Sequence, residues 1–243
     1  MDWKAFFALD KDLPPDAGFE LFGKEHIFWL CFAAAVIIAL CLLYRSKDEK
    51  GRKKLRIFMG CAVLFLEFAK DINHIVQGCM DVYCLPLHLC GLAVFFTFFD
   101  SLKPGKTVGN FLYSTCMPGA IFALVTPDWT YFPPFCYHSI VGFLVHTLLP
   151  AYPLMLLSGG DLKREAKRLP WCFLILVGLA IPIYFFDKHF YANYMFLIVP
   201  APGSPLEWFE SFLGNPGYLL GYLPMLFGAW LLLYLPYGKK KKA

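Results

Sequence analysis

Seven blocks of predominantly apolar residues, most of them close to 20 residues long, constrain the fold of this chain more than any other feature. A helix of about 20 residues crosses the roughly 30 Å hydrocarbon core of a bilayer. The chain has 243 residues, 58% hydrophobic and 16% charged, and a soluble domain of this size would not tolerate that balance. We therefore expect an all-α polytopic membrane protein, a single seven-helix domain over residues 1–243. The predicted transmembrane helices run approximately over residues 26–44, 57–76, 85–99, 108–126, 135–157, 171–189 and 216–235.

The positions of Lys and Arg predict the orientation of these helices, because cytoplasmic loops carry an excess of basic residues. Most of the 22 basic residues fall in the first, third and fifth loops and in the tail. We therefore expect the N-terminus outside and the C-terminus in the cytoplasm. The residues that carry this pattern are Arg45, Lys47, Lys50, Arg52, Lys53, Lys54, Arg56, Lys103, Lys106, Lys163, Arg164, Lys167, Arg168 and Lys239 to Lys242.

The net charge of +4 follows from the same basic residues, which contact anionic headgroups, and it predicts no nucleic-acid partner. The small size and short loops favour a bacterial plasma membrane. Lysines three and four positions from the C-terminal end are also typical of proteins retrieved to the endoplasmic reticulum, which is the alternative for a eukaryotic protein. The sequence does not indicate an oligomeric state.

Nine cysteines are scattered along the chain without the paired spacing of a disulfide framework. Most of them fall within predicted membrane helices. Cys79, Cys84 and Cys136 instead fall near the predicted outer face, where oxidation is possible. Three thiols cannot all pair with one another.

Four ionisable residues of the second block lie on one helical face. Glu67, Lys70, Asp71 and His74 have the spacing i, i+3, i+4, i+7. A charge at membrane depth is costly unless it is paired or hydrated, so we expect this face to point into the protein. It either contributes to a functional site or forms a structural ion-pair network, since Lys70 can neutralise the neighbouring carboxylates.

The predicted helix directions place most ionisable groups of the membrane segments in the outer half of the bundle. In the second, third and fifth helices, these groups lie between the outer end and the middle of the span. One polar cavity, open to the outer leaflet or the outer face, would accommodate them all. Its predicted residues are Glu67, Lys70, Asp71, His74, His88, Cys90, His138 and His146.

Cys90 is the candidate nucleophile. The run Leu85–Cys90 (LPLHLC) places it close to a helix start at a proline, where unpaired backbone N–H groups and the helix dipole stabilise a thiolate. A thiol also needs a neighbouring base at neutral pH, and His88 and His146 are the candidates. His88 lies on a different helical face from Cys90, whereas His146 comes from another helix at a compatible depth. The alternatives are that Cys90 is a small apolar core residue and His146 a hydrogen-bonded core histidine.

Metal binding is a competing use of the same groups, because imidazole and carboxylate ligands suit zinc. No compact motif such as His-Glu-x-x-His supports it, and we expect no metal and no cofactor. The competing ligand set is His74, His88, His138 and His146 with Asp71 or Glu67.

The stretch Leu206–Leu213 lies in the loop before the last block and can place its apolar side chains on one face. Two interpretations are open: a short helix lying in the membrane interface, or an ordinary loop of the aromatic belt.

Two sequence runs and the overall layout resemble a known family. The run LPLHLC at 85–90, the run Asn193–Leu197 (NYMFL) followed by Pro200, the chain length and the seven blocks resemble the YwaF-like integral membrane proteins, which include eukaryotic transmembrane protein 164. The resemblance covers essentially the whole chain. It implies a seven-helix fold distantly similar to that of the androgen-induced gene 1 family of lipid-ester hydrolases.

For the site, this resemblance implies a Cys/His acyltransferase that moves fatty acyl groups between phospholipids. The motif cysteine corresponds to Cys90, and the histidine of the fifth helix corresponds to His146 or to His138. Asn193 is then counted among the residues that support the site.

We therefore expect a membrane-embedded lipid acyltransferase or lipid-ester hydrolase that acts on membrane phospholipids. Cys90 would form the thioester and His146 would act as the base, while the charged face of the second helix orients the histidines. One alternative is a non-enzymatic binder or proton-coupled transporter that uses the same polar cavity. The other is a metal-dependent membrane hydrolase.

Overall fold

The computed structural model describes residues 3–9, 13–14 and 16–235, and the regular structure of these residues is entirely helical. The lysine tail at 239–242, which contributes to the predicted orientation, lies outside the described residues. The chain divides into two compact units, residues 1–163 and residues 164–243. The prediction of one seven-helix domain stays a prediction.

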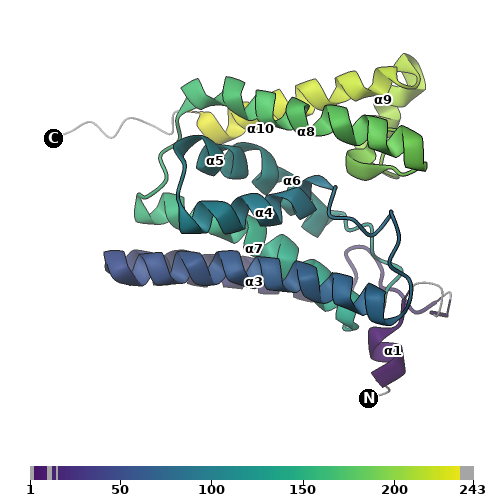
Figure 1. Cartoon of the computed structure of the whole chain (residues 1–243), viewed down its shortest axis with the longest axis horizontal. Helices are drawn as coiled ribbons and strands as arrows, with labels where there is room; N and C mark the ends of the chain where they lie inside the picture. The colour runs from purple at the N-terminus through teal and green to yellow at the C-terminus, as the bar shows by residue number, and fades with distance from the viewer. Residues whose placement is uncertain (1–2, 10–12, 15, 236–243) are drawn as a thin grey trace. The chain divides into compact units, whose positions relative to one another are not determined.

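The first unit contains the first five apolar blocks, and each of them is helical over most of its length (Figure 1). The fourth block is helical without a break, and its middle is a π-helical segment. The elements are α1 (Trp3–Phe7), α2 (Lys24–Ser46), α3 (Glu49–Val76), α4 (Leu89–Leu102), α5 (Lys106–Phe111), the π-helix η2 (Leu112–Cys116), α6 (Met117–Val125) and α7 (Tyr137–Gly159).

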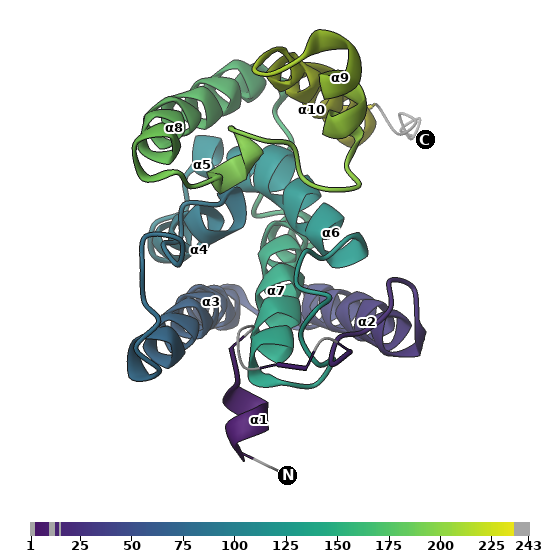
Figure 2. The ribbon, with the colours of Figure 1, turned by 90° about the vertical axis from the view of Figure 1, so that its right-hand side faces the viewer.

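Helix α7 is the centre of the first unit. It packs against α2, α3, α4 and α6, and Figure 2 shows it between α2 and α3. Its sequence is apolar on all sides, as expected for a helix that is surrounded by others. On α7, Phe143 is fully buried and stacks on Trp29 of α2, with ring centroids 4.8 Å apart. This central position lets α7 present side chains to several neighbours.

A polar network joins α2, α3 and α7 at one end of this unit. The Tyr44 hydroxyl donates to Asp161, and Arg52 Nη1 donates to the Gly159 carbonyl at 2.8 Å. A Cβ atom at Gly159 would come within 2.6 Å of the Tyr44 ring, so glycine is required for this contact.

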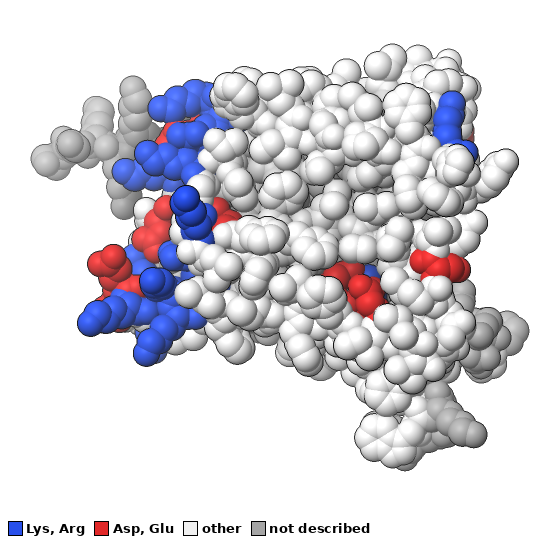
Figure 3. All heavy atoms as spheres, in the orientation of Figure 1, with Lys and Arg blue, Asp and Glu red and all other residues white. Residues whose placement is uncertain are grey.

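The first turns of α3 carry the dense group of Lys and Arg visible in Figure 3. The basic residues of the α2–α3 connection therefore gather at one end of the unit's helices, but the side that faces the cytoplasm stays a prediction.

The third apolar block begins its helix later than the sequence predicts. We expected a start at Leu85 with Pro86 in the first turn, but α4 begins at Leu89 and His88 is the N-cap residue. At the other end, the Tyr152 hydroxyl of α7 donates to Asp100 at 2.8 Å. The prediction was wrong because residues 85–88 form a turn that packs on the helix instead of extending it.

The second unit contains the last two apolar blocks and the loop between them. In that loop the stretch before the last block is a helix, which confirms the helical interpretation of Leu206–Leu213. Trp208 and Phe212 are exposed on this helix, and Leu206 is buried. The elements are η3 (Ala166–Arg168), α8 (Leu169–Phe190), η4 (Tyr194–Phe196), α9 (Pro205–Leu213), η5 (Gly217–Gly221) and α10 (Tyr222–Tyr234).

Five helical stretches in the described part of the chain are long and apolar enough to cross a membrane. Helix α3 is long enough but carries many charges, and α4 has only 14 residues. Both are segments for which we predicted a span, so the seven-span count stays a prediction. The five stretches are Lys24–Ser46, Lys106–Val125, Tyr137–Gly159, Ala166–Phe190 and Gly217–Tyr234.

Candidate functional site

The turn before α4 places Cys90 in the first turn of the helix. Gly91 allows this turn to fold back, because a Cβ atom there would lie 2.8 Å from the Pro86 carbonyl oxygen. His88, the N-cap residue, is exposed, and Cys90, the second residue of the helix, is half-buried. The first-turn backbone N–H groups have no partner within the helix and favour a thiolate on Cys90, whereas burial and the charges of Glu67 and Asp128 oppose one. The helix starts later than predicted, but Cys90 still lies in its first turn, as the sequence indicates.

His146 of α7 is held in a definite orientation. Its Nδ1 lies 2.8 Å from the Gly142 carbonyl oxygen, and since a carbonyl only accepts, Nδ1 carries the proton. In the neutral ring, Nε2 then has the lone pair that a base needs. The Trp129 ring covers the imidazole with centroids 4.8 Å apart, and a Cβ atom at Gly142 would lie only 3.2 Å from that tryptophan.

Two carboxylates lie near enough to both Cys90 and His146 to interact electrostatically with them. Glu67 of α3 and Asp128 of the α6–α7 loop each interact electrostatically with both Cys90 and His146. No hydrogen bond joins Cys90 directly to His146 among the described residues. His88 interacts electrostatically with Asp128 and with His146 as well. We call Glu67, Cys90, Asp128 and His146 the Cys90 cluster; it assembles side chains from three helices and one loop.

Sequence analysis missed Asp128 and Trp129. Both lie in the loop between α6 and α7, which the sequence indicates only as an outer loop rich in proline and aromatic residues. Asp128 is exposed, whereas the indole Nε1 of Trp129 is buried and has no hydrogen-bond partner. The available signal was one carboxylate next to a tryptophan in an otherwise uncharged loop.

The charged face of α3 is paired internally, as one of its two interpretations predicts. Lys70 Nζ lies 2.5 Å from Glu67 Oε1 and 3.5 Å from Asp71 Oδ1. Glu67 is only 5% exposed, so Lys70 compensates a buried carboxylate. The structural interpretation does not exclude the functional one, because Glu67 also belongs to the Cys90 cluster.

His74, the last residue of that face, belongs to a different group of side chains. Its Nδ1 lies 3.7 Å from Cys84 Sγ, and its ring lies edge-on to His138 with centroids 5.2 Å apart. The Asn73 side-chain amide donates to His138 Nε2 at 2.8 Å. The structure thus places His138 beside His74, whereas His146 interacts with Glu67 and Asp128, the carboxylates that also interact with Cys90.

Asn193 of the second unit organises its own loop. Its Oδ1 accepts from the backbone N–H groups of Ile198 and Val199, and its Nδ2 donates to the Val199 carbonyl. Met195 and Phe196, within the same run, have positive φ angles of 53° and 54°. This run is therefore a strained turn held by Asn193, and the predicted contribution of Asn193 to a site stays a prediction.

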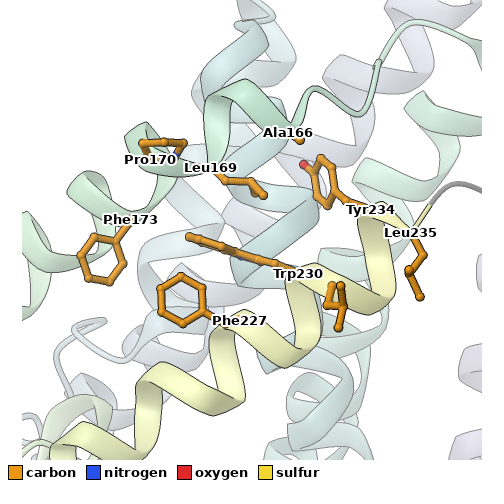
Figure 4. Close-up of a pocket in the computed structure, with 9 residues that line it drawn as sticks. Ala166, Leu169, Pro170, Phe173, Phe227, Trp230, Tyr234 and Leu235 are labelled. Atoms are coloured by element: carbon orange, nitrogen blue, oxygen red, sulfur yellow. The ribbon is translucent and has the colours of Figure 1, made fainter.

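An apolar groove of about 680 Å³ lies within the second unit, between the start of α8 and the end of α10 (Figure 4). Its lining residues carry no acid, amine, imidazole or thiol, and the buried Trp230 Nε1 has no hydrogen-bond partner. The groove therefore offers shape but no acid–base chemistry. The lining residues are Ala166, Leu169, Pro170, Phe173, Phe227, Trp230, Leu231, Tyr234 and Leu235.

The described residues contain no group of three or more His, Cys, Asp or Glu side chains arranged to hold a metal ion.

Comparison with known families connects this geometry to other proteins. The sequence model of the TMEM164 family matches residues 21–234, which include every residue of the Cys90 cluster. The chain belongs to the TMEM164 family. This match confirms the resemblance indicated by the LPLHLC and NYMFL runs, and together with the apolar helices it identifies an integral membrane protein. No curated protein and no solved structure matches the chain.

Proposed function

We propose that this member of the TMEM164 family is a membrane-embedded enzyme that transfers or hydrolyses the acyl groups of phospholipids through a thioester on Cys90. The observation that carries the proposal is the assembly of the Cys90 cluster. A thiol at a helix N-terminus and an imidazole with a defined lone pair share two carboxylate neighbours within one unit. Thiol acyl chemistry uses this combination of groups.

The proposed reaction has two halves. Cys90 Sγ attacks the acyl carbonyl carbon while His146 Nε2 takes the thiol proton, and the resulting tetrahedral intermediate expels the lipid alkoxide. The alkoxide receives that proton from His146, which leaves a thioester and a lysolipid. An acceptor hydroxyl then attacks the thioester, gives its proton to His146 and restores the thiol. A lipid acceptor makes the enzyme a transferase and water makes it a hydrolase.

The surrounding charges favour the proton transfer to His146. Glu67 and Asp128 stabilise the imidazolium that forms when Cys90 loses its proton. The same carboxylates oppose a thiolate on Cys90, whereas the first-turn N–H groups of α4 favour one. Since Cys90 and His146 are not hydrogen-bonded, the proposal requires them to approach each other when a lipid is bound, as catalytic groups often do.

We also propose that α3 and α4 span the membrane with the five apolar stretches, which gives seven spans with the N-terminus outside. Helix α4 covers about 21 Å at 1.5 Å per residue, and the preceding turn adds to that length. The charged face of α3 is paired internally, which lowers the cost of inserting it. The Cys90 cluster would then lie in the outer half of a bacterial plasma membrane, or in the endoplasmic reticulum of a eukaryotic cell.

Intact mass spectrometry of the full-length protein after incubation with phospholipid vesicles tests the thioester. We expect an adduct of acyl mass that hydroxylamine removes, together with a change in lipid composition. Both should disappear in Cys90→Ala and persist in Cys61→Ala, which removes an exposed thiol of α3. An unchanged lipid composition over hours with no adduct, or an adduct that persists in Cys90→Ala, would overturn the proposal.

A non-enzymatic binder or proton-coupled transporter is the second candidate function. The pair formed by the buried Glu67 and the half-buried Lys70 in α3 favours it, since paired charges at membrane depth commonly mark ion or substrate pathways. Under this alternative, Glu67→Gln abolishes transport or binding while Cys90→Ser leaves it intact. Under the enzyme proposal, Cys90→Ser is inactive.

A further inference from the structure

The turn between α3 and α4 brings two cysteines close together. Cys79 donates its backbone N–H to the His74 carbonyl at 2.9 Å, and Cys84 donates its own to the Asp81 carbonyl at 3.2 Å. Gly78, with a φ of +65°, reverses the chain just before Cys79. As a result, Cys84 Sγ lies 3.6 Å from the Cys79 carbonyl oxygen. Both residues are half-buried thiols in this structure.

His74, at the end of α3, provides a base for this pair. Its Nδ1 is 3.7 Å from Cys84 Sγ, so it can accept the thiol proton. Lys70, one turn earlier on the same face, interacts electrostatically with Cys84 and favours its thiolate. Asp81, whose Oδ1 is 3.4 Å from Cys84 Sγ, is the opposing charge on the turn. The base, the cation and the acid face one thiol, which is the arrangement of a cysteine whose reactivity is controlled.

The structure also separates these two cysteines from the third one near the predicted outer face. Cys136 is 3% exposed and its Sγ is 3.8 Å from the Ser139 hydroxyl. Cys79 and Cys84, by contrast, are half-buried and lie in the same turn between α3 and α4. Of the three thiols near the predicted outer face, Cys79 and Cys84 are thus the two that share a turn and are not buried.

We propose that Cys79 and Cys84 form a reversible dithiol–disulfide pair that closes the turn leading into α4. The oxidant is a small-molecule disulfide. The Cys84 thiol gives its proton to His74, and its sulfur attacks one sulfur of the oxidant, which releases one thiol and leaves a mixed disulfide on Cys84. The Cys79 thiol then loses its proton to solvent, its sulfur attacks Cys84 Sγ, and the released thiolate takes up a proton to become the second thiol. Two protein thiols are oxidised and one oxidant disulfide is reduced to two thiols.

The closed form would link the end of α3 covalently to the segment that precedes His88. The ring formed by residues 79–84 is short, so the entropy cost of closing it is small. This proposal is independent of the proposed function, because it concerns the oxidation state of the turn and not the chemistry of Cys90.

The test uses the full-length protein in detergent micelles, equilibrated in buffers of reduced and oxidised glutathione and then quenched with N-ethylmaleimide. In oxidised buffer we expect two fewer labelled thiols, a mass lower by two hydrogens, and a proteolytic peptide linked through Cys79 and Cys84. Reduced buffer should restore both labels. Cys79→Ser should stop at the mixed disulfide with glutathione, whereas Cys61→Ser should behave as the unmodified chain.

The variant His74→Gln tests whether His74 affects the rate at which the Cys79–Cys84 disulfide forms without affecting its equilibrium. We expect closure to slow by about tenfold or more, because a base contributes that much to a proton transfer, with an unchanged midpoint in the glutathione series. An unchanged rate would overturn the role of His74. Labelling of both thiols at equilibrium in oxidised buffer, or a linked peptide that contains another cysteine, would overturn the pair itself.

Discussion

The first unit contains two arrangements of a cysteine and a histidine, and they differ in how the chain builds them. Cys84 and His74 are ten residues apart and touch directly, with Sγ and Nδ1 separated by 3.7 Å. Cys90 and His146 come from different helices, have no hydrogen bond between them and share Glu67 and Asp128 as charged neighbours. Direct contact between thiol and imidazole is therefore found at Cys84 and not at Cys90, although charged side chains lie near both thiols.

This difference indicates different chemistry at the two sites. A local turn keeps Cys84 Sγ close to the backbone of a second cysteine, Cys79, which suits exchange of disulfides. The Cys90 cluster instead places carboxylates from α3 and from the α6–α7 loop around His146, which suits a reaction in which the imidazole becomes charged. Contact between a thiol and an imidazole does not by itself identify an acyl-transfer site.

The largest expected effect separates the two histidines. His146→Gln should lower kcat/KM for lipid acyl transfer by about a hundredfold or more, the usual contribution of a general base. The matched change His74→Gln should alter it by less than about twofold, a difference small in free energy. Product release from radiolabelled phospholipid vesicles measures both. A larger loss in His74→Gln than in His146→Gln would place the acyl chemistry at the Cys84 turn and would contradict the proposed role of His146.

A smaller effect is expected at the carboxylates. Asp128→Asn removes a charge that stabilises the imidazolium of His146, and we expect about a tenfold loss of kcat, or about 1.4 kcal/mol in the barrier. The steady-state rate with vesicle substrate measures it. Asp81→Asn, the equivalent change beside Cys84, is the control and should leave turnover unchanged. Equal losses in the two variants would mean that Asp128 supports the fold and not the reaction.

The smallest effect concerns the pH dependence of Cys84. Burial raises the pKa of the Cys84 thiol above its ordinary value, so its thiolate fraction at pH 7 is lower than that of a free thiol. In Cys79→Ser, alkylation of Cys84 by iodoacetamide should rise about tenfold per pH unit from pH 7 to pH 9 without levelling off. Glutathione, with an ordinary thiol pKa, should begin to level off within that range. A plateau for Cys84 below pH 8 would show a stabilised thiolate instead.

The helices were predictable from the sequence because apolar blocks of membrane length leave the backbone few alternatives. The start of α4 was not, since Pro86 suggested a first turn and the chain instead folds Leu85–His88 back over Gly91. The cost of burying Glu67 predicted a partner, and Lys70 is that partner. The sequence grouped His74 with Glu67 because both lie on the same face of α3. In the structure His74 contacts Cys84, because side chains at different positions along a helix of 28 residues lie beside different parts of the chain.

The sequence by itself determined that this chain is helical, that it belongs in a membrane, and that Cys90 and the charged face of α3 are the residues to examine. Those conclusions depend on composition and on spacing along one helix, which are local properties. Only the tertiary structure shows that Cys90 and His146 share Glu67 and Asp128 as charged neighbours, that Asn73 donates to His138, and that Cys84 contacts His74. These contacts are set by how α3, α4 and α7 pack, and helix packing depends on side chains far apart in the sequence.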